Sequence, residues 1–478
     1  MGSSWFIAAC VFLTPGCSLA MSLPASAVLP RLPLPAPLLS NQPGTWAHDT
    51  MSRRVREEIL GREVLEANAE ALSAPELEGC RQSLLALDQE LAAAATTPLR
   101  HLLPHEEAVS PDAEAWRSTL SPLVERGATW LDAPWLVAEF YLYRRVMESL
   151  GFFTRPEAFF DPFLASKRKG LDSCMSSMEA LAPSVLGALA AFGPRQQMAS
   201  SAKEDKEAVD DADLGVSLRL FALISLWGNR MDLSLWPAGS KGNVADAFEQ
   251  VLAAGEANLL SDDFSKLAEV AAKCRSQGGK RVDIIVDNAG FELVTDLLLA
   301  DFLVTSGIAS TVVFQLKAHP TFVSDARACD LEEHVNTLSG LNPETNPGCS
   351  ELGARFRAHL SSGSWVLQEH LFWVQPGAMW EMPAGLRSEL SEESALAFTK
   401  GDANYRRLLG DRQWALDAPF QGVCGYFPTV LCALRTLKAE LGCGMGEHHT
   451  NRAAAEDEKW MVNGRYGVIQ VAVPDELE

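Results

Sequence analysis

Short apolar runs rich in β-branched residues alternate with helical patterns through the C-terminal half of the chain. VDIIVD (282–287) precedes the helical stretch ELVTDLLLADFLV (292–304), and the run STVVFQLK (310–317) follows that helix. Because these runs are apolar on both faces, they are typical of a parallel sheet covered by helices on both sides. The alternation predicts an α/β fold for residues 216–478: an αβα sandwich with a mostly parallel sheet.

Further apolar runs extend the predicted sheet. Three of them are residues 394–402, 426–436 and 466–473. The run SLRLFALISLWGN (217–229) is also apolar throughout, and we count it with the candidate strands. The stretch 243–260 has a helical pattern and would connect this run to the rest of the sheet.

The first half of the chain has a different pattern. Apolar residues at three- and four-residue spacing predict a helical bundle domain, which we place at residues 36–200. Residues 201–215 are polar and charged, and we expect them to form an acidic linker to the α/β domain. The length of 478 residues agrees with two domains.

Residues 1–35 form a separate segment. Residues 1–48 contain no Asp or Glu and one basic residue, Arg31. An apolar start without positive charge is an incomplete secretory signal, so this segment is either an organellar or secretory leader or a disordered extension. The ten cysteines include no CxxC pair, and their spacings match no structural zinc pattern. We therefore expect free thiols and a cytoplasmic location, with a leader at 1–35 as the alternative.

The formal net charge of −22 limits the classes of partner. Binding of a nucleic acid or an anionic membrane requires a basic face, so we expect neither partner. No stretch reaches the ~20 apolar residues that a membrane-spanning helix needs. A small phosphorylated substrate is compatible with this charge, because a single pocket can be basic on an acidic protein. The sequence leaves the oligomeric state open.

Polar side chains recur where the predicted strands end. Asp287 and Asn288 follow the run 282–286, and Asp325 follows the run 310–317 after a short turn. Ligands in open α/β sheets bind outside the carboxyl ends of the strands. We therefore expect these groups at one edge of the sheet. The same edge would receive residues from the other candidate strands: Lys317, Asp402, Asn404, Arg406, Asn229 and Asp232.

Carboxylate and amide oxygens are the ligands that Mg²⁺ and Mn²⁺ prefer. Such a site usually keeps open positions for water and a substrate phosphate. Lys317, Arg406 and the run RTLK (435–438) would supply the positive charge that a phosphate needs. From the residues alone, a phosphate-handling metal site and a set of helix caps and salt bridges are equally good interpretations.

Several short motifs occur in an order and spacing that resemble a known family. DNAGFEL (287–293) is followed by FVSD (322–325), KGDANYRRL (400–408) and RTLK. Upstream stand PGTWAHDT, PWLVAEFYLYRR, DPFLASK and LWGNRMDLS. From about Pro35 onward the chain resembles the metal-dependent damage-control phosphatases, also described as acidic-residue (protein-glutamate) methyltransferases and long catalogued as a domain of unknown function. The RTLK run resembles the sequence motif that distinguishes the branch of this family acting on sugar phosphates.

The resemblance implies roles for the matching residues. Asp287, Asn288 and Asp325 match the family's metal ligands, which are also its catalytic and substrate-contacting residues. Further positions match residues that contact the phosphorylated substrate: Glu292, Asp402, Ala403, Asn404, Tyr405, Arg406 and Lys438. Ala403 stands where family members usually have Leu, and its expected contribution is its backbone.

The implied activity is hydrolysis of hexose phosphates, such as fructose 1-phosphate and fructose 6-phosphate, and of related damaged or excess phosphometabolites. The implied cofactor is Mn²⁺, Co²⁺, Ni²⁺ or Mg²⁺. One alternative is an S-adenosylmethionine-dependent protein-glutamate O-methyltransferase, although no GxGxG-type loop follows a first strand. Another is a non-catalytic sugar-phosphate sensor. The sequence does not decide whether water attacks phosphorus directly or Asp287 first forms a phosphoenzyme.

Overall fold

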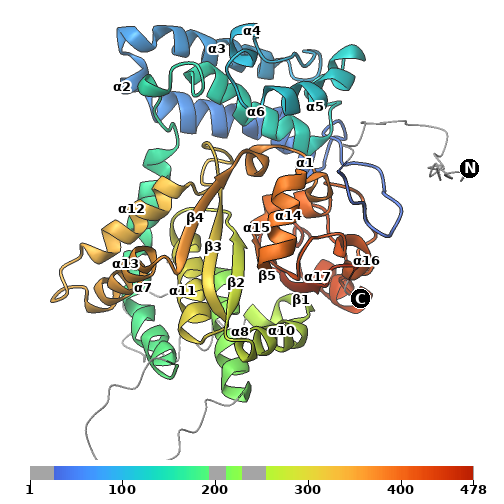
Figure 1. Ribbon diagram of the computed structural model, residues 1–478. Helices are drawn as coiled ribbons and strands as arrows, with labels where there is room; N and C mark the ends of the chain where they lie inside the picture. The colour runs from blue at the N-terminus through green and yellow to red at the C-terminus, as the bar shows by residue number, and fades with distance from the viewer. Residues whose placement is uncertain (1–25, 193–210, 229–254, 477–478) are drawn as a thin grey trace, which may run out of the picture.

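The computed structural model describes residues 26–192, 211–228 and 255–476 (Figure 1). In this part of the chain, seven strands form one sheet in the order β1-β7-β6-β5-β2-β3-β4. Neighbouring strands are parallel except for β7, which runs antiparallel to β6. The strands are β1 (Leu259–Asp262), β2 (Lys280–Ile285), β3 (Ala309–Lys317), β4 (Trp365–His370), β5 (Ser394–Lys400), β6 (Leu431–Thr436) and β7 (Gly467–Ala472). The predicted α/β fold with a mostly parallel sheet is confirmed.

Helices cover both faces of this sheet, and strand residues alternate between two apolar cores. Val282 and Ile284 of β2 pack into one core, and Ile285 packs into the other. The first core contains α7 (Leu164–Ala190), α8 (Asp211–Trp227), α10 (Phe264–Ser276), α11 (Phe291–Thr305), α12 (Ala328–Ser339) and α13 (Pro347–Ser362). The second core contains η5 (Leu371–Val374), η6 (Met379–Glu381), α14 (Ala384–Glu393), α15 (Gly401–Leu408), α16 (Phe420–Cys424) and α17 (Glu447–Glu456). The predicted αβα layering follows from this arrangement.

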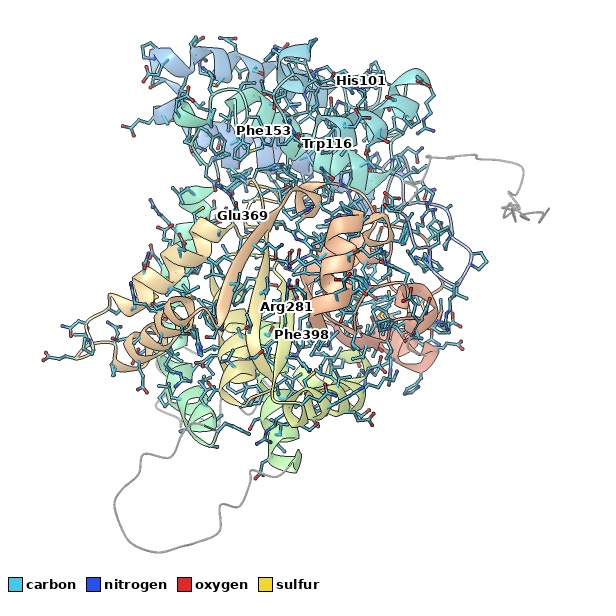
Figure 2. The ribbon with its side chains drawn as sticks, viewed as in Figure 1. His101, Trp116, Phe153, Arg281, Glu369 and Phe398 are labelled. Atoms are coloured by element: carbon cyan, nitrogen blue, oxygen red, sulfur yellow. The ribbon has the colours of Figure 1, made fainter. Side chains whose placement is uncertain are left out.

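The N-terminal helices form a bundle that lies over one end of the sheet (Figure 1). They are α1 (Trp46–Asp49), η1 (Thr50–Glu66), α2 (Ala69–Leu72), η2 (Pro75–Leu77), α3 (Glu78–Ala92), α4 (Pro104–Glu107), α5 (Ala113–Glu125), α6 (Trp135–Leu150) and η3 (Pro156–Ala158). Their apolar side chains belong to the second core, so the bundle and that face of the sheet share one interior. Figure 2 labels Trp116 and Phe153 in the bundle region and Phe398 in the sheet. The helix α7, placed with the bundle by the predicted boundary at residue 200, packs instead against α11 and α13 of the α/β layer.

The carboxyl edge of the sheet faces the bundle. The ring of Phe322, in the loop after β3, lies 4.8 Å from that of Phe140 and 4.9 Å from that of Tyr143, measured between ring centroids. Both partners are on α6. Helix α6 therefore packs against the loop after β3 at this edge of the sheet.

Some sequence-based expectations need correction. The run 217–229 is not a strand: residues 211–227 form α8, whose apolar side chains are buried against α11 and the sheet. A helix that is apolar all round is a buried helix, and its sequence resembles that of a buried strand. The predicted helix 243–260 lies mostly outside the described residues, and its last two residues begin β1. Two strands, β1 and β4, were not predicted.

The expected N-terminal segments fall partly within the described residues. Residues 26–35 of the expected leader or extension lie on the α/β layer, where the Arg31 N–H donates to Gly422 O at 3.1 Å. Residues 211–215 of the expected acidic linker belong to α8, and the rest of that linker lies outside the described ranges. No helix in the part of the chain that the structure describes is long and apolar enough to cross a membrane.

Candidate functional site

Asp287 lies just beyond the end of β2, on the face of the sheet that carries the second core. Its side chain packs against Gly401, the first residue of α15. A Cβ atom at position 401 would lie 1.8 Å from Asp287 Oδ2, and Gly401 has a φ of +78°. Glycine is therefore required at position 401 both for its backbone conformation and for the space that Asp287 occupies.

The loop after β3 brings Asp325 to the same place. Phe322 and Val323 have φ values of 45° and 65°, an unusual backbone for non-glycine residues that reverses the chain direction. Asn288 and Asp325 then pair across an isolated antiparallel bridge. The bridge is flanked by two hydrogen bonds: Ala289 N–H donates to Ser324 O at 2.7 Å, and Ala326 N–H donates to Asp287 O at 2.8 Å. The two loops are thus held together by their backbones.

The side chains of this cluster are linked through the Asn288 amide. Asn288 Nδ2 donates to Asp287 Oδ2 at 2.9 Å and to Glu292 Oε2 at 2.8 Å. Asn288 Oδ1 accepts from Ser324 Oγ at 2.5 Å. Glu292, in the first turn of α11, is 6% exposed and Asp287 is 5% exposed. Two carboxylates therefore lie within hydrogen-bonding distance of a single amide group in a largely water-excluded place.

Electrostatics at this cluster are unfavourable for the anions alone. Burial, followed by the negative charges of Asp325 and Glu292, raises the pKa of Asp287 well above its ordinary value. Burial also raises the pKa of Asp325, and the positive charge of Lys317 is the largest opposing influence. Carboxylates that are buried together gain from a nearby cation, because their charged forms are otherwise destabilised.

The oxygen atoms at this edge fit a hard or borderline divalent cation. Asp287 Oδ1 is buried without a hydrogen-bond partner. A half-turn of the Asn288 amide would place its oxygen beside Asp287 and its NH₂ group beside Ser324 Oγ. Within the described ranges, no three His, Cys, Asp or Glu side chains lie close enough together to hold a metal ion. The candidate set therefore contains two carboxylates, Asp287 and Asp325, completed by the amide.

A small cavity opens beside the cluster at the N-terminus of α11. Its volume is about 160 Å³, and it is lined by Gly170, Ser173, Gly228, Asn288, Ala289, Gly290, Phe291, Glu292 and Ser324. Gly290, with a φ of +77°, begins α11, and its N–H donates to His334 Nε2 at 2.8 Å. His334 Nδ1 lies 2.7 Å from Asp330 O, so the geometry favours a proton on Nδ1 and an acceptor at Nε2. The residues that line this cavity therefore come in part from α7, from α11 and from the loop after β3.

Lys317, the last residue of β3, lies behind Asp325. Its Nζ is 3.1 Å from Asp325 Oδ2, an ion pair whose angle falls outside hydrogen-bond geometry. The same Nζ donates to Asn404 Oδ1 at 3.1 Å. Asn404 Nδ2 donates in turn to Lys400 O at 2.9 Å and to Val286 O at 3.1 Å. Asn404, expected to contact substrate, is placed by the structure with its whole amide engaged by the protein.

Asp402 lies at the start of α15 and is paired with Arg435. Asp402 Oδ1 accepts from Arg435 Nε at 2.8 Å and from the Lys438 N–H at 3.1 Å. Arg435 is buried and its guanidinium carbon lies 4.3 Å from the Tyr405 ring centroid. The RTLK run therefore contributes one structural arginine and one lysine. The Lys438 ammonium opposes the rise in the pKa of Asp287 and forms no ion pair with any residue that the structure describes.

The structure places Arg406 in a position different from the phosphate contact expected for it. Its guanidinium is buried between Glu139 Oε2 at 2.6 Å and Asp411 Oδ1 at 2.8 Å, and it stacks on Trp135 at 3.6 Å. Two carboxylates satisfy this cation, which ties α15 to α6. Arg406 is therefore engaged by protein carboxylates in this structure, which gives no support to its expected role as a phosphate contact.

The two remaining residues expected to contact substrate lie in α15. The Tyr405 hydroxyl is buried and donates to Gln470 Oε1 of β7 at 2.7 Å. Ala403 is buried in the first turn of the helix. The expected groups Asn229 and Asp232 lie outside the described residues.

Sequence reasoning missed two parts of this site. Gly401 lies in the KGDANYRRL motif, and no role was predicted for it. A glycine directly after a strand and before an acidic residue nevertheless indicates a close approach of the backbone. Lys317 was named as a source of positive charge, but no local pattern indicated that Asn404, 87 residues away, would accept its hydrogen bond.

Comparison with known proteins supports the assignment of these motifs. The family described as "Damage-control phosphatase ARMT1-like domain" matches residues 50–452. The Damage-control phosphatase ARMT1 of Danio rerio is 34% identical over 377 residues, which cover 76% of this chain and 80% of that protein. The human protein of the same name is 34% identical over 356 residues, covering 72% of this chain and 76% of that protein.

A solved structure also aligns with this chain. It is a DUF89 family protein from Pyrococcus horikoshii, with a TM-score of 0.42 and 13% identity over 86% of this chain and 95% of that one. The family match spans most of the chain and contains every candidate site residue named above, from Asp287 to Lys438. This chain therefore belongs to the ARMT1-like damage-control phosphatase family.

Proposed function

We propose that this protein is a metal-dependent phosphatase that hydrolyses sugar phosphates, with hexose phosphates such as fructose 1-phosphate and fructose 6-phosphate as its substrate class. The observation that carries the proposal is the convergence of Asp287, Asn288 and Asp325 at the carboxyl edge of the sheet, joined by a backbone bridge. Membership in a family named for phosphatase activity supports the reaction type. The RTLK element supports the sugar-phosphate class.

Asp287, Asn288 and Asp325 would hold one divalent cation: Mn²⁺, Co²⁺, Ni²⁺ or Mg²⁺. When bound, this cation polarises a phosphoryl oxygen and neutralises the negative charge that develops during hydrolysis. The unpartnered Asp287 Oδ1 and the raised pKa of the Asp287 carboxyl group both support a cation at this point. The ligand assignment is thus supported by donor chemistry as well as by motif order.

The remaining groups would bind and orient the ester. Lys438 would hold a phosphoryl oxygen, because its ammonium is the cation near Asp287 that no described carboxylate engages in an ion pair. Glu292 faces the cavity at the N-terminus of α11, where it would bind a sugar hydroxyl or orient the attacking water. Asp402 would fix the Lys438 backbone through its hydrogen bond to the Lys438 N–H.

The direct test is phosphate release from a panel of phosphate esters, measured with each of the four divalent ions and with a chelator. The proposal expects release from hexose phosphates that requires added metal. Asp287→Ala should abolish release and metal binding together. Asp172→Ala, which removes an exposed carboxylate of α7, should change neither. Metal-restored hydrolysis by Asp287→Ala would refute the ligand assignment.

The rival activities appear as different outcomes of the same series. Transfer of a labelled methyl group from S-adenosylmethionine to a protein carboxylate, without phosphate release, would identify a methyltransferase. Tight hexose-phosphate binding without release under any of the ions would identify a sensor. Acid quenching of a reaction with a radiolabelled phosphate ester would separate direct attack from a phosphoenzyme, since only the latter leaves labelled phosphate covalently bound to Asp287 before hydrolysis.

A further inference from the structure

We propose that Lys317 is a positioning residue for cation binding: it holds one oxygen of Asp325 so that the other is presented beside Asp287, and Asn404 fixes Lys317 in that position. The inference rests on the metal site of the proposed function. It concerns residues that contact one another, and it assigns Lys317 and Asn404 roles that differ from a substrate contact.

The placement of Lys317 is costly unless it serves the site. Its side chain is 1% exposed, and an ammonium group that is moved out of water loses hydration that its protein partners must replace. Its ammonium group lies 3.1 Å from Asp325 Oδ2 and 3.1 Å from Asn404 Oδ1. The ammonium is therefore fixed between one charged and one neutral oxygen, within the interior of the protein.

Asn404 can present only its oxygen to Lys317. Both hydrogens of its amide face backbone carbonyl oxygens, Lys400 O at 2.9 Å and Val286 O at 3.1 Å, at the ends of β5 and β2. Turning the amide over would place Asn404 Oδ1 against these carbonyl oxygens and its NH₂ group against an ammonium. Neither contact is a hydrogen bond, so the orientation of Asn404 is determined by the sheet itself.

Because Lys317 Nζ pairs with Asp325 Oδ2, we infer that the second oxygen, Oδ1, is the one offered to a cation. The bridge between Asn288 and Asp325 fixes the backbone of Asp325, and Lys317 fixes the rotation of its carboxylate. In metal sites, groups that orient the ligands contribute to affinity although they do not touch the ion. Lys317 and Asn404 orient the metal ligand Asp325 in the same way.

Charge alone predicts the opposite effect on metal affinity. If Lys317 acted only as a positive charge, its removal would reduce repulsion of the cation and tighten metal binding. If Lys317 orients Asp325, its removal leaves the Asp325 carboxylate free to turn away from Asp287, and metal binding weakens. The direction of the change in affinity therefore distinguishes the two roles.

Lys400 offers a matched control. It is the last residue of β5, its side chain is likewise 1% exposed, and its ammonium also pairs with a buried carboxylate, Asp296, at 3.2 Å. Lys400 Nζ additionally donates to Ser225 O of α8, on the face of the sheet that carries the first core. Lys317 and Lys400 are thus two buried lysines at strand ends that point to opposite faces.

The experiment measures Mn²⁺ binding to the full-length protein by the electron paramagnetic resonance signal of free Mn²⁺, which disappears on binding. Lys317→Met should raise the dissociation constant about 10- to 100-fold, the usual cost of removing a group that orients a metal ligand. Lys400→Met should leave it unchanged, although both variants lose a buried ion pair. An unchanged or lower dissociation constant for Lys317→Met would overturn the proposal.

A double-mutant cycle tests whether Lys317 acts through Asp325. Asp325→Asn should weaken Mn²⁺ binding, and adding Lys317→Met to it should cause no further loss. If the two substitutions reduced Mn²⁺ affinity additively, Lys317 would not act through Asp325. Should Lys317→Met fail to fold, Asn404→Ala provides the second measurement: weakened Mn²⁺ binding supports the inference, and unchanged binding overturns it.

Failure of the proposed function is distinguishable from failure of this inference. If the wild-type protein binds Mn²⁺ in an Asp287-dependent manner but releases no phosphate from any ester, the function fails and the Lys317 test still applies. If wild type and Asp287→Ala bind Mn²⁺ equally, the cation site itself is wrong and the inference is overturned with it.

Discussion

Asn288 and Asp325 face each other across an isolated antiparallel bridge, although 37 positions separate them in the chain. The flanking hydrogen bonds from Ala289 N–H and Ala326 N–H, at 2.7 and 2.8 Å, hold the two loops at a fixed separation. The donor atoms are therefore brought together by backbone pairing before any ligand binds. A site organised in this way loses little entropy when it takes up a cation or a substrate.

Gly401→Ala should disrupt the site through Asp287. The added methyl group would lie 1.8 Å from Asp287 Oδ2, so the carboxylate must move, and the φ of +78° adds about 1 kcal/mol of backbone strain. We expect lost metal binding and a lower free energy of unfolding. Gly363→Ala is the control, because Gly363 has a φ of +76° and open space around its Cβ position. Equal Mn²⁺ affinities in the two variants would contradict the role of Gly401.

Asp287→Asn should stabilise the metal-free protein while removing metal binding. Burial and the charges of Asp325 and Glu292 raise the pKa of Asp287, so the neutral form is the one that the folded protein favours without a cation. An uncharged amide should raise the free energy of unfolding of the metal-free protein, because it removes a buried negative charge that the fold disfavours. Urea titration with and without Mn²⁺ measures both effects. A lower free energy of unfolding for metal-free Asp287→Asn would contradict the conclusion that the charged form of Asp287 is destabilising.

Arg406→Met should reduce stability more than it changes substrate affinity. The guanidinium neutralises Glu139 and Asp411, and removal of one partner from a buried ion pair costs about 3–5 kcal/mol. The free energy of unfolding should fall by this order, with the KM for a hexose phosphate nearly constant wherever the variant is folded. A large rise in KM at unchanged stability would show instead that Arg406 contacts the substrate phosphate.

Stability should fall in mild acid because of His319. Burial, and then the positive charge of Arg144, lowers the pKa of His319 from 6.5 to about 4. The folded protein therefore keeps His319 neutral while the unfolded chain takes up a proton. The contribution of neutral His319 to the free energy of unfolding is fully present above pH 6.5 and is lost as the pH falls toward 4. The total loss is about 3 kcal/mol over that range.

The variant His319→Leu should remove this part of the pH dependence. Unfolding by urea at pH 7, 6 and 5 should give a shallower slope of free energy against pH than the wild type. His105→Leu, which replaces an exposed histidine of α4, should keep the wild-type slope. A His319→Leu protein with the wild-type slope would show that other groups cause the acid sensitivity.

The sequence predicted those parts of the fold that local patterns determine. β2, β3 and β5 were predicted because β-branched apolar runs end in polar groups, and their carboxyl ends carry Asp287, Lys317 and Asp402 as expected. β4 escaped prediction because only three apolar residues (365–367) precede the polar Gln368 and Glu369, a run too short to indicate a buried strand; β4 is an edge strand of the sheet. α8 was misread because an evenly apolar run has no helical period.

The sequence could not predict which charged residues in the motifs are engaged by other protein side chains. Arg406 and Lys438 are both positively charged residues in the motifs that resemble the family. Of the two, Arg406 is enclosed by carboxylates from other segments, Glu139 on α6 and Asp411 after α15. Such pairings depend on tertiary structure. The positions of Asp287, Asn288 and Asp325 follow a simpler rule, since they occur directly at or just beyond strand ends.

The central claim is that Asp287, Asn288 and Asp325 together hold one divalent cation at the carboxyl edge of the sheet. Its most direct test is a crystal of the protein grown with Mn²⁺ and measured with X-rays near the manganese absorption edge. We expect a single strong anomalous peak within coordination distance of Asp287 Oδ1, the Asn288 amide oxygen and an Asp325 carboxylate oxygen. Anomalous density elsewhere on the molecule, with this place empty, would contradict it.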